Sequence, residues 1–425
     1  MNKEIIKKNF FLYSLSLDNI LFFSASILPI ALMAGAFFSN LFATVVSIIF
    51  LLISINKKII SYYKNIFILI FFSFCIFLVI SSVASDFKLF SLKSSLIYFR
   101  HGIFAIAIAY CLINYKNFKV YFFYSLLFSY ILIIVTGYYE FIYNENIFGV
   151  KSDLYRLSMI TNEKWIVGGY ISRTLPIALV LFLVIGKDKL INKYLLFLFL
   201  LLFILSFLLV ILSGERSPMV VIIITMIICL FILNKFKKIR LFFLFSSIIL
   251  SVLVVNYNEN LKTRIIKHTY SQLGFYSGQL NLFSPVHEEY YSESFAMFKQ
   301  SPIIGKGPNT FRKYCDHVDY NIGDYCSTHP HNYYFQLLGE TGLIGFLYLF
   351  SSFIFISWII FKQTMFKLKI FSEGITNNLL ILYTSMFSLL WPIIPSYNFF
   401  NSWNSITLYL IAGFLLADYF SNENN

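Results

Sequence analysis

The sequence predicts an all-α, polytopic membrane protein with about twelve transmembrane helices. Of its 425 residues, 59% are hydrophobic and only 12% are charged, whereas a soluble domain carries roughly a quarter charged residues. Apolar runs of about 20 residues, the length that crosses a bilayer, recur along the whole chain. No soluble domain is expected beside them, so residues 1–425 are predicted to form a single integral membrane domain.

The predicted spans follow one another with short connections, and the second and ninth are the shortest. The first begins late and lacks a small-residue cleavage site, so no cleavable signal peptide is expected. The spans are predicted at residues 20–38, 40–55, 66–84, 95–113, 118–137, 166–186, 193–213, 217–234, 241–256, 342–361, 379–397 and 402–420.

Lysine and arginine concentrate in alternate connections, which predicts that those connections and both termini are cytoplasmic. The net charge of +13 therefore reflects topology and does not indicate nucleic acid binding. The basic residues on the predicted inner side are Lys3, Lys7, Lys8, Lys57, Lys58, Lys64, Lys116, Lys119, Lys187, Lys189, Lys193, Lys235, Lys237, Lys238, Arg240, Lys362, Lys367 and Lys369.

Two outer connections are long, at residues 138–165 and 257–331. The second is too polar for lipid and too long for a turn, so it is predicted to fold as a periplasmic cap inserted between the ninth and tenth spans. Loops of this length are usually functional. The sequence contains no phosphate-binding glycine loop or nucleotide fingerprint, which disfavours an ATP-driven machine.

Two of the five cysteines, Cys315 and Cys326, lie in the predicted cap. On an oxidising side of the membrane, a disulfide between them is the simplest interpretation. The alternative is a metal site, but the spacing of the nearby side chains matches no common metal-binding pattern, and no metal is predicted. Those side chains are Asp316, His317, Asp319 and His329.

Two arginines lie inside predicted spans, where charge is costly and usually faces a polar cavity or a partner. Arg173 sits between glycines and a proline, in residues 168–176, which indicates an opened, hydrated site. Arg100 is at a similar depth, roughly 10 Å below the outer surface. For Arg100, an alternative is a side chain that extends to the outer headgroups.

Arg216 ends the seventh span, followed by Ser217 as the expected N-cap and Pro218 as the expected first helical residue. A helix N-terminus attracts anions. The alternative is a simple ion pair with Glu215. A cationic pocket in the outer leaflet would suit a lipid-linked phosphate or pyrophosphate, for which a planar guanidinium is a good match.

His331 follows Pro330 at the mouth of a helix that leads into the tenth span. Pro330 is expected in the first helical turn, where the helix dipole would disfavour an imidazolium and keep the ring neutral. A neutral imidazole is a suitable general base near pH 7. The alternative is a histidine that only hydrogen-bonds Glu340 or a backbone group.

Several motifs together resemble the O-antigen ligase and polymerase superfamily of bacterial envelope glycosyltransferases. His331 and Gly342 reproduce its His-x10-Gly motif, within residues 329–345 that begin His329-Pro330. Residues 301–311 are similar to its proline–glycine stretch. Residues 216–220 resemble its Arg-x3-Leu, with Val220 in place of leucine. Arg156 lies in a stretch that weakly resembles a further family arginine motif.

The resemblance implies a bacterial inner-membrane enzyme with its active site facing the periplasm. Its donor would be a glycan linked to undecaprenyl pyrophosphate, and an acceptor hydroxyl would attack the anomeric carbon. By that analogy His331 deprotonates the acceptor and Arg216 holds the pyrophosphate. Arg173 is assigned to the same pocket from its depth and charge. The resemblance implies neither a cofactor nor a metal.

One position departs from the family. An arginine is often found about fourteen residues before the Ser301-Pro302 pair, and here that position is His287. A protonated histidine can contact phosphate. Otherwise another cation of the cap takes over the charge, or the acceptor differs from the usual one. The candidate cations are Arg264, Lys299 and Arg312.

The leading hypothesis is a ligase that transfers an O-antigen-like glycan to lipid A-core. The alternative is a polymerase that uses a second lipid-linked repeat unit as acceptor, and transfer to a protein is a further option. A transporter for an anionic lipid or solute is the third hypothesis, because intramembrane arginines alone would suit it. The large cap and a base at the outer surface argue against transport, since transporters bind near the bilayer midplane.

Overall fold

The computed structural model describes residues 16–152, 156–158, 166–187, 193–233, 237–276, 278, 280–315 and 326–423. Within these residues the chain is helical, and extended pairing is limited to isolated bridges such as Glu145–Lys151. Eight of the described helices are long and apolar enough to cross a membrane. The predicted all-α, polytopic class is therefore confirmed.

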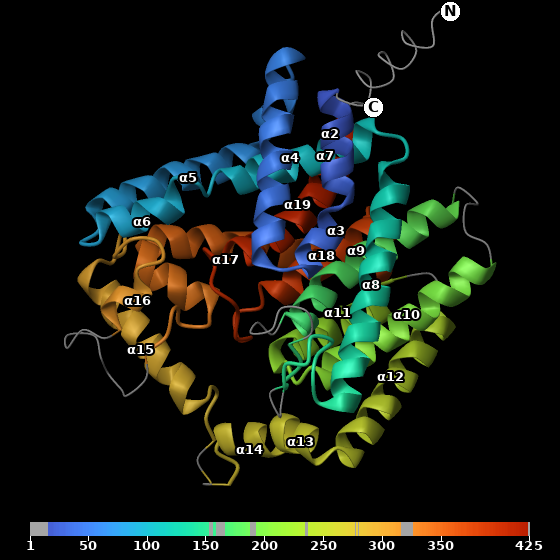
Figure 1. Cartoon of the computed structure of the whole chain (residues 1–425). Helices are drawn as coiled ribbons and strands as arrows, with labels where there is room; N and C mark the ends of the chain where they lie inside the picture. The colour runs from blue at the N-terminus through green and yellow to red at the C-terminus, as the bar shows by residue number, and fades with distance from the viewer. Residues whose placement is uncertain are drawn as a thin grey trace, which may run out of the picture.

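Helices in the first half of the chain run from the described N-terminal end to the long connection after residue 143 (Figure 1). They are α2 (Leu17–Ser26), α3 (Leu28–Met33), α4 (Ala36–Asn56), η1 (Ser61–Lys64), α5 (Ile66–Ala84), α6 (Lys88–Ser95), α7 (Arg100–Asn114) and α8 (Phe118–Tyr143).

The second half contains further membrane helices and the short helices of the predicted cap (Figure 1). They are α9 (Val167–Lys187), α10 (Lys193–Leu212), α11 (Arg216–Ile232), α12 (Lys237–Tyr257), α13 (Glu259–Lys262), the π-helix η3 (Thr263–Lys267), α14 (His268–Gln272), α15 (Pro285–Gln300), α16 (Phe311–Tyr314), α17 (Tyr333–Lys367), α18 (Asn377–Leu389) and α19 (Ser402–Glu423).

Every predicted span coincides with a helix, but two spans are interrupted. The span at 20–38 covers α2, α3 and the start of α4, because α2 ends at Ser26, Pro29 lies in the first turn of α3, and Gly35 precedes α4. The span at 379–397 ends at Leu389, since the prolines at 392 and 395 cannot continue a helix. The count of about twelve spans stays a prediction.

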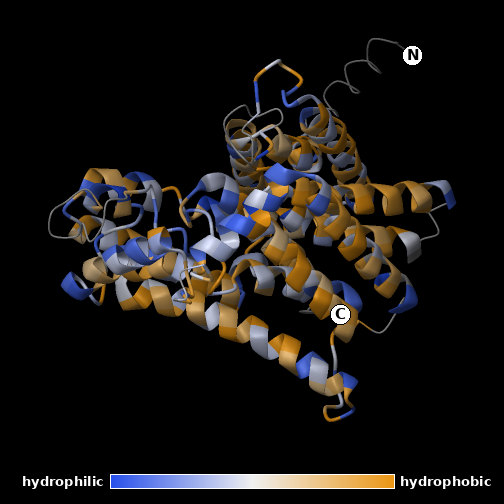
Figure 2. Cartoon of the chain, turned by 90° about the horizontal axis from the view of Figure 1, so that it is seen from below, coloured by the Kyte–Doolittle hydropathy of each residue, from blue (hydrophilic) through white to orange (hydrophobic). Residues whose placement is uncertain are grey.

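The helices pack so that apolar side chains face both inward and outward. In the interior, α7 packs against α19, and α15 packs against α17. On the outside, large apolar side chains such as Phe37, Ile55 and Phe197 are more than two-thirds exposed, and apolar residues cover the outer faces of the long helices (Figure 2). This distribution fits a protein surrounded by lipid, where backbone polar groups are satisfied inside helices.

The predicted cap contains a small core of its own, separate from the main one. Tyr290 and Tyr291 of α15 pack with Phe311 and Tyr314 of α16. Phe335 of α17 stacks on Tyr291, with ring centroids 4.2 Å apart. The part of the cap formed by α15 and α16 thus rests on the first turns of α17. That it faces the periplasm stays a prediction.

The two glycine-containing motifs bind each other through their backbones. The amides of Lys306 and Gly307 donate to the carbonyls of Gly339 (3.1 Å) and Glu340 (2.7 Å), and the amide of Leu343 donates to the carbonyl of Pro302 (2.8 Å). Gly342 has φ +64° and ψ −161°, a region open essentially to glycine alone. The glycine at position 342 therefore has a structural role: it lets the loop 301–307 lie directly against α17.

Gly342→Ala is expected to destabilise the protein by at least about 2 kcal/mol, because a side chain there is strained and crowded. A Cβ at this position would lie 2.5 Å from the backbone of Ile303. Thermal unfolding in detergent would measure the effect. Gly149→Ala is the matched control, since Gly149 also has a positive φ but a Cβ there would meet no atom within 4 Å. Equal losses for both variants would contradict the role of the close backbone contact.

Candidate active site

His331 lies at the junction between the cap and α17, in a left-handed conformation with φ +56°. Non-glycine residues rarely adopt this conformation, and such strain gathers at functional sites. The carbonyl of His331 accepts from the amide of Ser396 (2.7 Å), which holds the backbone in place. Asn332 follows as the N-cap of α17, its side chain accepting from the amides of Tyr334 and Phe335.

The placement of Pro330 in the first helical turn is therefore wrong. The helix begins at Tyr333, because the side chain of Asn332 caps it and His331 is not helical. The alternative in which His331 bonds Glu340 is also wrong. The carboxylate of Glu340 instead accepts from the amides of Asn309 (2.9 Å) and Phe311 (2.8 Å) and from Gln336.

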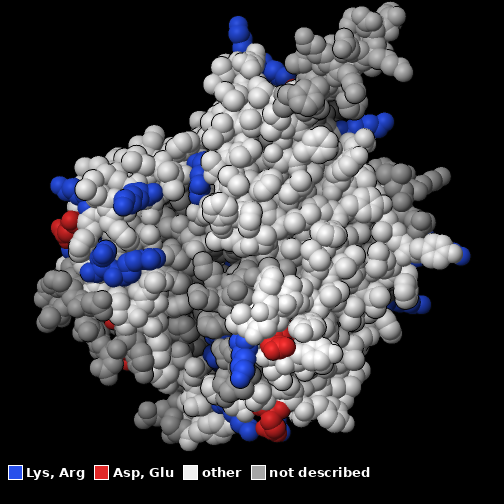
Figure 3. Space-filling model, in the orientation of Figure 1, with Lys and Arg blue, Asp and Glu red and all other residues white. Residues whose placement is uncertain are grey.

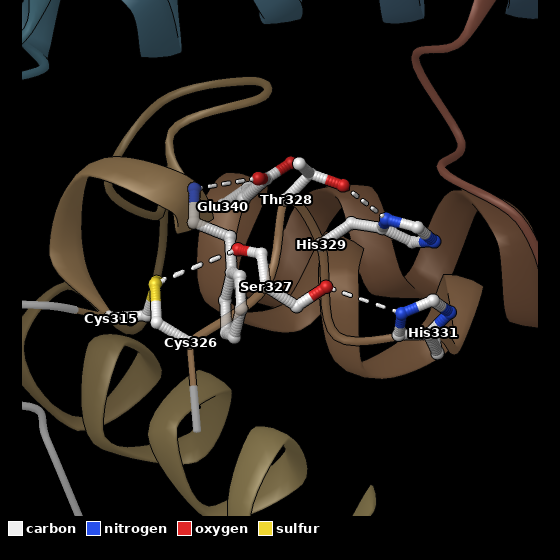
Figure 4. The surroundings of a disulfide bond; sticks show 8 residues. Cys315, Cys326, Ser327, Thr328, His329, His331 and Glu340 are labelled. Carbon is white, nitrogen blue, oxygen red and sulfur yellow. Dashed lines mark hydrogen bonds between the residues drawn. A yellow bond between two sulfur atoms is a disulfide. The ribbon is translucent and has the colours of Figure 1, made fainter. Parts of the chain in front are cut away.

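The His331 ring lies beside a serine hydroxyl, two other imidazole rings and a tyrosine ring. Its Nε2 lies 3.2 Å from Ser327 Oγ. Its centroid is 4.1 Å from that of His329 and 5.8 Å from those of His287 and Tyr290. Figure 4 shows Ser327 and His329 on the same side of the loop as the His331 ring. Three histidines thus lie together, of which His331 was predicted as the base and His287 as a contact for the pyrophosphate.

Burial keeps this ring uncharged. Burial, together with smaller contributions from the nearby His287 and Arg156, lowers the pKa of His331 to about 4. Burial similarly lowers the pKa of His287, with Arg216 contributing. At neutral pH the imidazole of His331 is therefore a free base, as general-base chemistry requires. The main cause is burial, and His331 lies outside the helix whose dipole was predicted to act on it.

Arg216 begins α11, and the residue before it, Glu215, is the N-cap. The predicted N-cap Ser217 and first helical residue Pro218 are wrong by two positions, because Arg216 already has helical geometry. Pro218 still fits, since amides of the first turn need no partner within the helix. The half-buried Arg216 donates through Nη1 to Thr269 of α14 (3.0 Å).

Glu215 does not pair with Arg216 as the alternative supposed. Its buried carboxylate accepts from the amide of Gly168 (2.7 Å) and from the hydroxyl of Tyr397 (2.9 Å). Burial raises the pKa of Glu215 to about 7, against the opposing effects of these bonds and of Arg156 and Arg173. Glu215 is thus a carboxyl group held among arginines, whereas the sequence suggested it only as an ion-pair partner of Arg216.

Arg156 lies close enough to Glu215, Arg216 and His331 to act on each electrostatically. Its loop is anchored by Ser158, whose amide and hydroxyl both donate to Glu140 of α8. Arg156 therefore connects the base to the arginine at α11. The weak motif around it proves to lie at the centre of the candidate site.

Among the cations considered as replacements for the family's loop arginine, Arg264 lies nearest to the turn at Gly214, which precedes α11. It sits on the π-helix η3, and its Nε lies 3.5 Å from the carbonyl of Gly214. Such π-helical turns are frequent at functional sites. Lys299 lies instead over the ring of Phe295, and Arg312 donates to Asn309.

Arg173 occupies a supporting position. It is only 5% exposed and donates to the carbonyl of Gly169 (3.1 Å) and to Asn404 (3.0 Å). Its guanidinium lies over the ring of Tyr397, 4.9 Å from the centroid. Because the hydroxyl of Tyr397 donates to Glu215, Arg173 acts on this carboxyl group indirectly, through Tyr397.

Arg100 is bonded to neutral side chains of neighbouring helices, namely Thr44, Asn40 and Ser402. Exposed basic residues gather elsewhere, over α6 and α16 (Figure 3). The arginines around Glu215 are thus distinct from the surface basic residues.

Cys315 and Cys326 are joined by a disulfide, with their Cα atoms 5.3 Å apart (Figure 4). The metal site considered as an alternative involved Asp316, His317 and Asp319, which lie outside the described residues. Tyr397, Thr269 and Ser327 are further members of the site that the sequence did not indicate. They come from three distant segments, and only a motif shared among relatives could have signalled them.

A comparison with known families finds a match. Residues 201–350 match the model of a family described as O-antigen ligase. The matched region contains Arg216, His287, His331 and Gly342, while Arg156 and Arg173 precede it. No curated protein matches the chain.

Proposed function

The family match supports the O-antigen ligase and polymerase superfamily that the motifs predicted, and from this premise we propose that the protein is a ligase. It would move an O-antigen-like glycan from undecaprenyl pyrophosphate to lipid A-core. Polymerisation, with a second lipid-linked repeat unit as acceptor, is the alternative within the superfamily. The observation that carries the proposal is an uncharged imidazole that lies near Arg156, which in turn lies near Arg216.

The proposed reaction is a single displacement. The acceptor hydroxyl loses its proton to a ring nitrogen of His331, and its oxygen attacks the anomeric carbon of the donor sugar. The bond from that carbon to the pyrophosphate oxygen breaks, and the electron pair leaves with the pyrophosphate. Such a displacement inverts the configuration at the anomeric carbon. His331 ends the step as an imidazolium and returns its proton to solvent.

The arginines would stabilise the negative charge that develops on the leaving pyrophosphate. Arg216 and Arg156 come from separate segments, one on α11 and one in the connection after α8, and lie near enough to influence each other. Preorganised cations of this kind are often the largest contributors to catalysis. Arg264 is proposed to extend the same anion site as a cation, and His287, whose pKa is lowered by burial, is proposed to extend it as an uncharged hydrogen-bond donor. Arg173 is proposed to act through Tyr397 and Glu215.

In the absence of donor, Glu215 supplies negative charge among the arginines, which would otherwise repel one another. Its contacts with Gly168 and Tyr397 join α9, α11 and the loop after α18 at this point. The proposed setting is the bacterial inner membrane, with the site on the periplasmic side and both termini in the cytoplasm. The disulfide beside the site supports an oxidising compartment there.

The test is incubation of the purified protein with a polyprenyl-pyrophosphate glycan and either lipid A-core or a second repeat unit. Transfer to lipid A-core is expected, and elongation of the repeat unit instead would identify a polymerase. Binding of the donor without transfer to either acceptor, together with its movement across vesicles, would favour the transporter hypothesis. Donor alone is the control, because it reports hydrolysis without an acceptor.

A further inference from the structure

The orientation of the His331 ring depends on a group outside the motifs. In neutral imidazole one nitrogen carries a proton and the other a lone pair, and the hydrogen bond at one nitrogen decides which is which. The group within hydrogen-bond distance of Nε2 is the hydroxyl of Ser327, at 3.2 Å. The backbone carbonyl of His331 is separately held by Ser396.

Ser327 is itself held by the disulfide. Cys326 directly precedes it, and the bonded partner Cys315 is 1% exposed, with its Sγ 3.5 Å from the carbonyl of Ser327. Figure 4 shows the disulfide, Ser327 and His331 in sequence along one loop. The position of the hydroxyl therefore depends on where Cys315 lies.

Cys315 is fixed in turn by α17. It follows α16, whose first residue Phe311 donates its amide to Glu340 (2.8 Å). Glu340 is on α17, the helix that begins two residues after His331. Ser327 is thus connected to that helix by two routes, one through the chain and one through the disulfide. The closed connection fixes the hydroxyl relative to the imidazole.

We propose that Ser327 is a positioning residue for His331, and that the Cys315–Cys326 disulfide holds it in place. The hydroxyl oxygen accepts a hydrogen bond from Nε2–H. The lone pair of the ring is then on Nδ1, where it can take the proton of the acceptor hydroxyl. This inference rests on the proposed function, because it assigns a partner to the proposed base.

The electrostatics of the site favour such a partner. When His331 takes up a proton, the imidazolium lies near the cationic Arg156 and in contact range of His329 and His287. The neighbourhood therefore opposes the charge. An oxygen that accepts from Nε2–H forms a stronger, charge-assisted bond with the imidazolium than with the neutral ring. Ser327 would thus offset part of the repulsion in the transition state.

The first test is Ser327→Ala, assayed for glycan transfer with saturating donor and acceptor. We expect kcat to fall about tenfold, as the loss of one hydrogen bond in the transition state predicts, with KM for the donor unchanged. Ser327→Thr keeps the hydroxyl and is expected to restore most of the rate. Thr328→Ala is the matched control, because this exposed neighbour bonds His329 through Nδ1 (3.0 Å) and does not contact His331.

The second test combines Ser327→Ala with Cys315→Ala/Cys326→Ala in a double-mutant cycle. If the disulfide acts through Ser327, removing the hydroxyl from the protein that lacks the disulfide causes no further loss in kcat. Losses that multiply would overturn the inference, and so would a full rate for Ser327→Ala.

Failure of this inference is distinguishable from failure of the proposed function. A fully active Ser327→Ala protein in which His331→Asn is inactive removes the positioning role and keeps the base. A fully active His331→Asn protein removes both.

Discussion

His331→Asn is expected to reduce glycan transfer by on the order of a thousandfold, because removal of a general base typically costs two to four orders of magnitude. Asparagine is the suitable replacement, since it tolerates the left-handed backbone at this position better than alanine. The variant should therefore fold, insert and form its disulfide normally. Transfer by purified protein in detergent or vesicles measures the effect.

His268→Ala is the matched control, because His268 lies on α14 and no role in the reaction is assigned to it. It should retain the wild-type rate. Full transfer by His331→Asn would exclude this residue as the base. A loss of membrane insertion or of the Cys315–Cys326 bond would instead show that the substitution had altered the fold.

The pH dependence of the wild-type rate provides a further check on the base. The active form of His331 is the neutral one, and burial lowers its pKa to about 4. Activity that depends on this ring is therefore present above that value and is lost as the pH falls through it. An ordinary histidine would lose activity near pH 6.5. Loss of activity near pH 7 would point instead to Glu215, because burial raises the pKa of its carboxyl group to about 7.

Arg216→Lys is expected to lower kcat by about tenfold or more, although the charge is kept. A guanidinium binds pyrophosphate through two parallel hydrogen bonds, whereas an ammonium is a point charge. Removal of one donor from a transition-state anion site costs on the order of a hundredfold in known cases. Steady-state kinetics with the lipid-linked donor would measure the change.

Arg240→Lys is the matched control near the other end of α11. Its guanidinium donates to the carbonyls of Leu230 (3.3 Å) and Leu233 (2.8 Å), far along the helix from Arg216. This variant should affect stability alone. Equal rates for Arg216→Lys and the wild type would reject bidentate binding at Arg216.

Local patterns predicted much of the site. The tenth span and the paired positions His331 and Gly342 were visible as a motif. The reason for a glycine at position 342 could not be seen in the sequence, because it depends on contact with Ile303, which lies 39 residues earlier along the chain. The start of α17 was placed too early, since proline suits a first turn in general. Here Asn332 caps the helix, and His331 is held outside it by Ser396.

Composition and apolar run length by themselves determined that the chain is a helical membrane protein, because a bilayer admits few other structures for such a sequence. The motifs indicated a resemblance to the O-antigen ligase superfamily and pointed to His331 as the proposed base. Only the tertiary structure showed that Arg156 lies close enough to act on that base, that the Ser327 hydroxyl lies 3.2 Å from its ring, and that Glu215 lies near Arg156. Their neighbourhood is created by packing between helices distant in sequence, and the burial that keeps His331 neutral arises from the same packing.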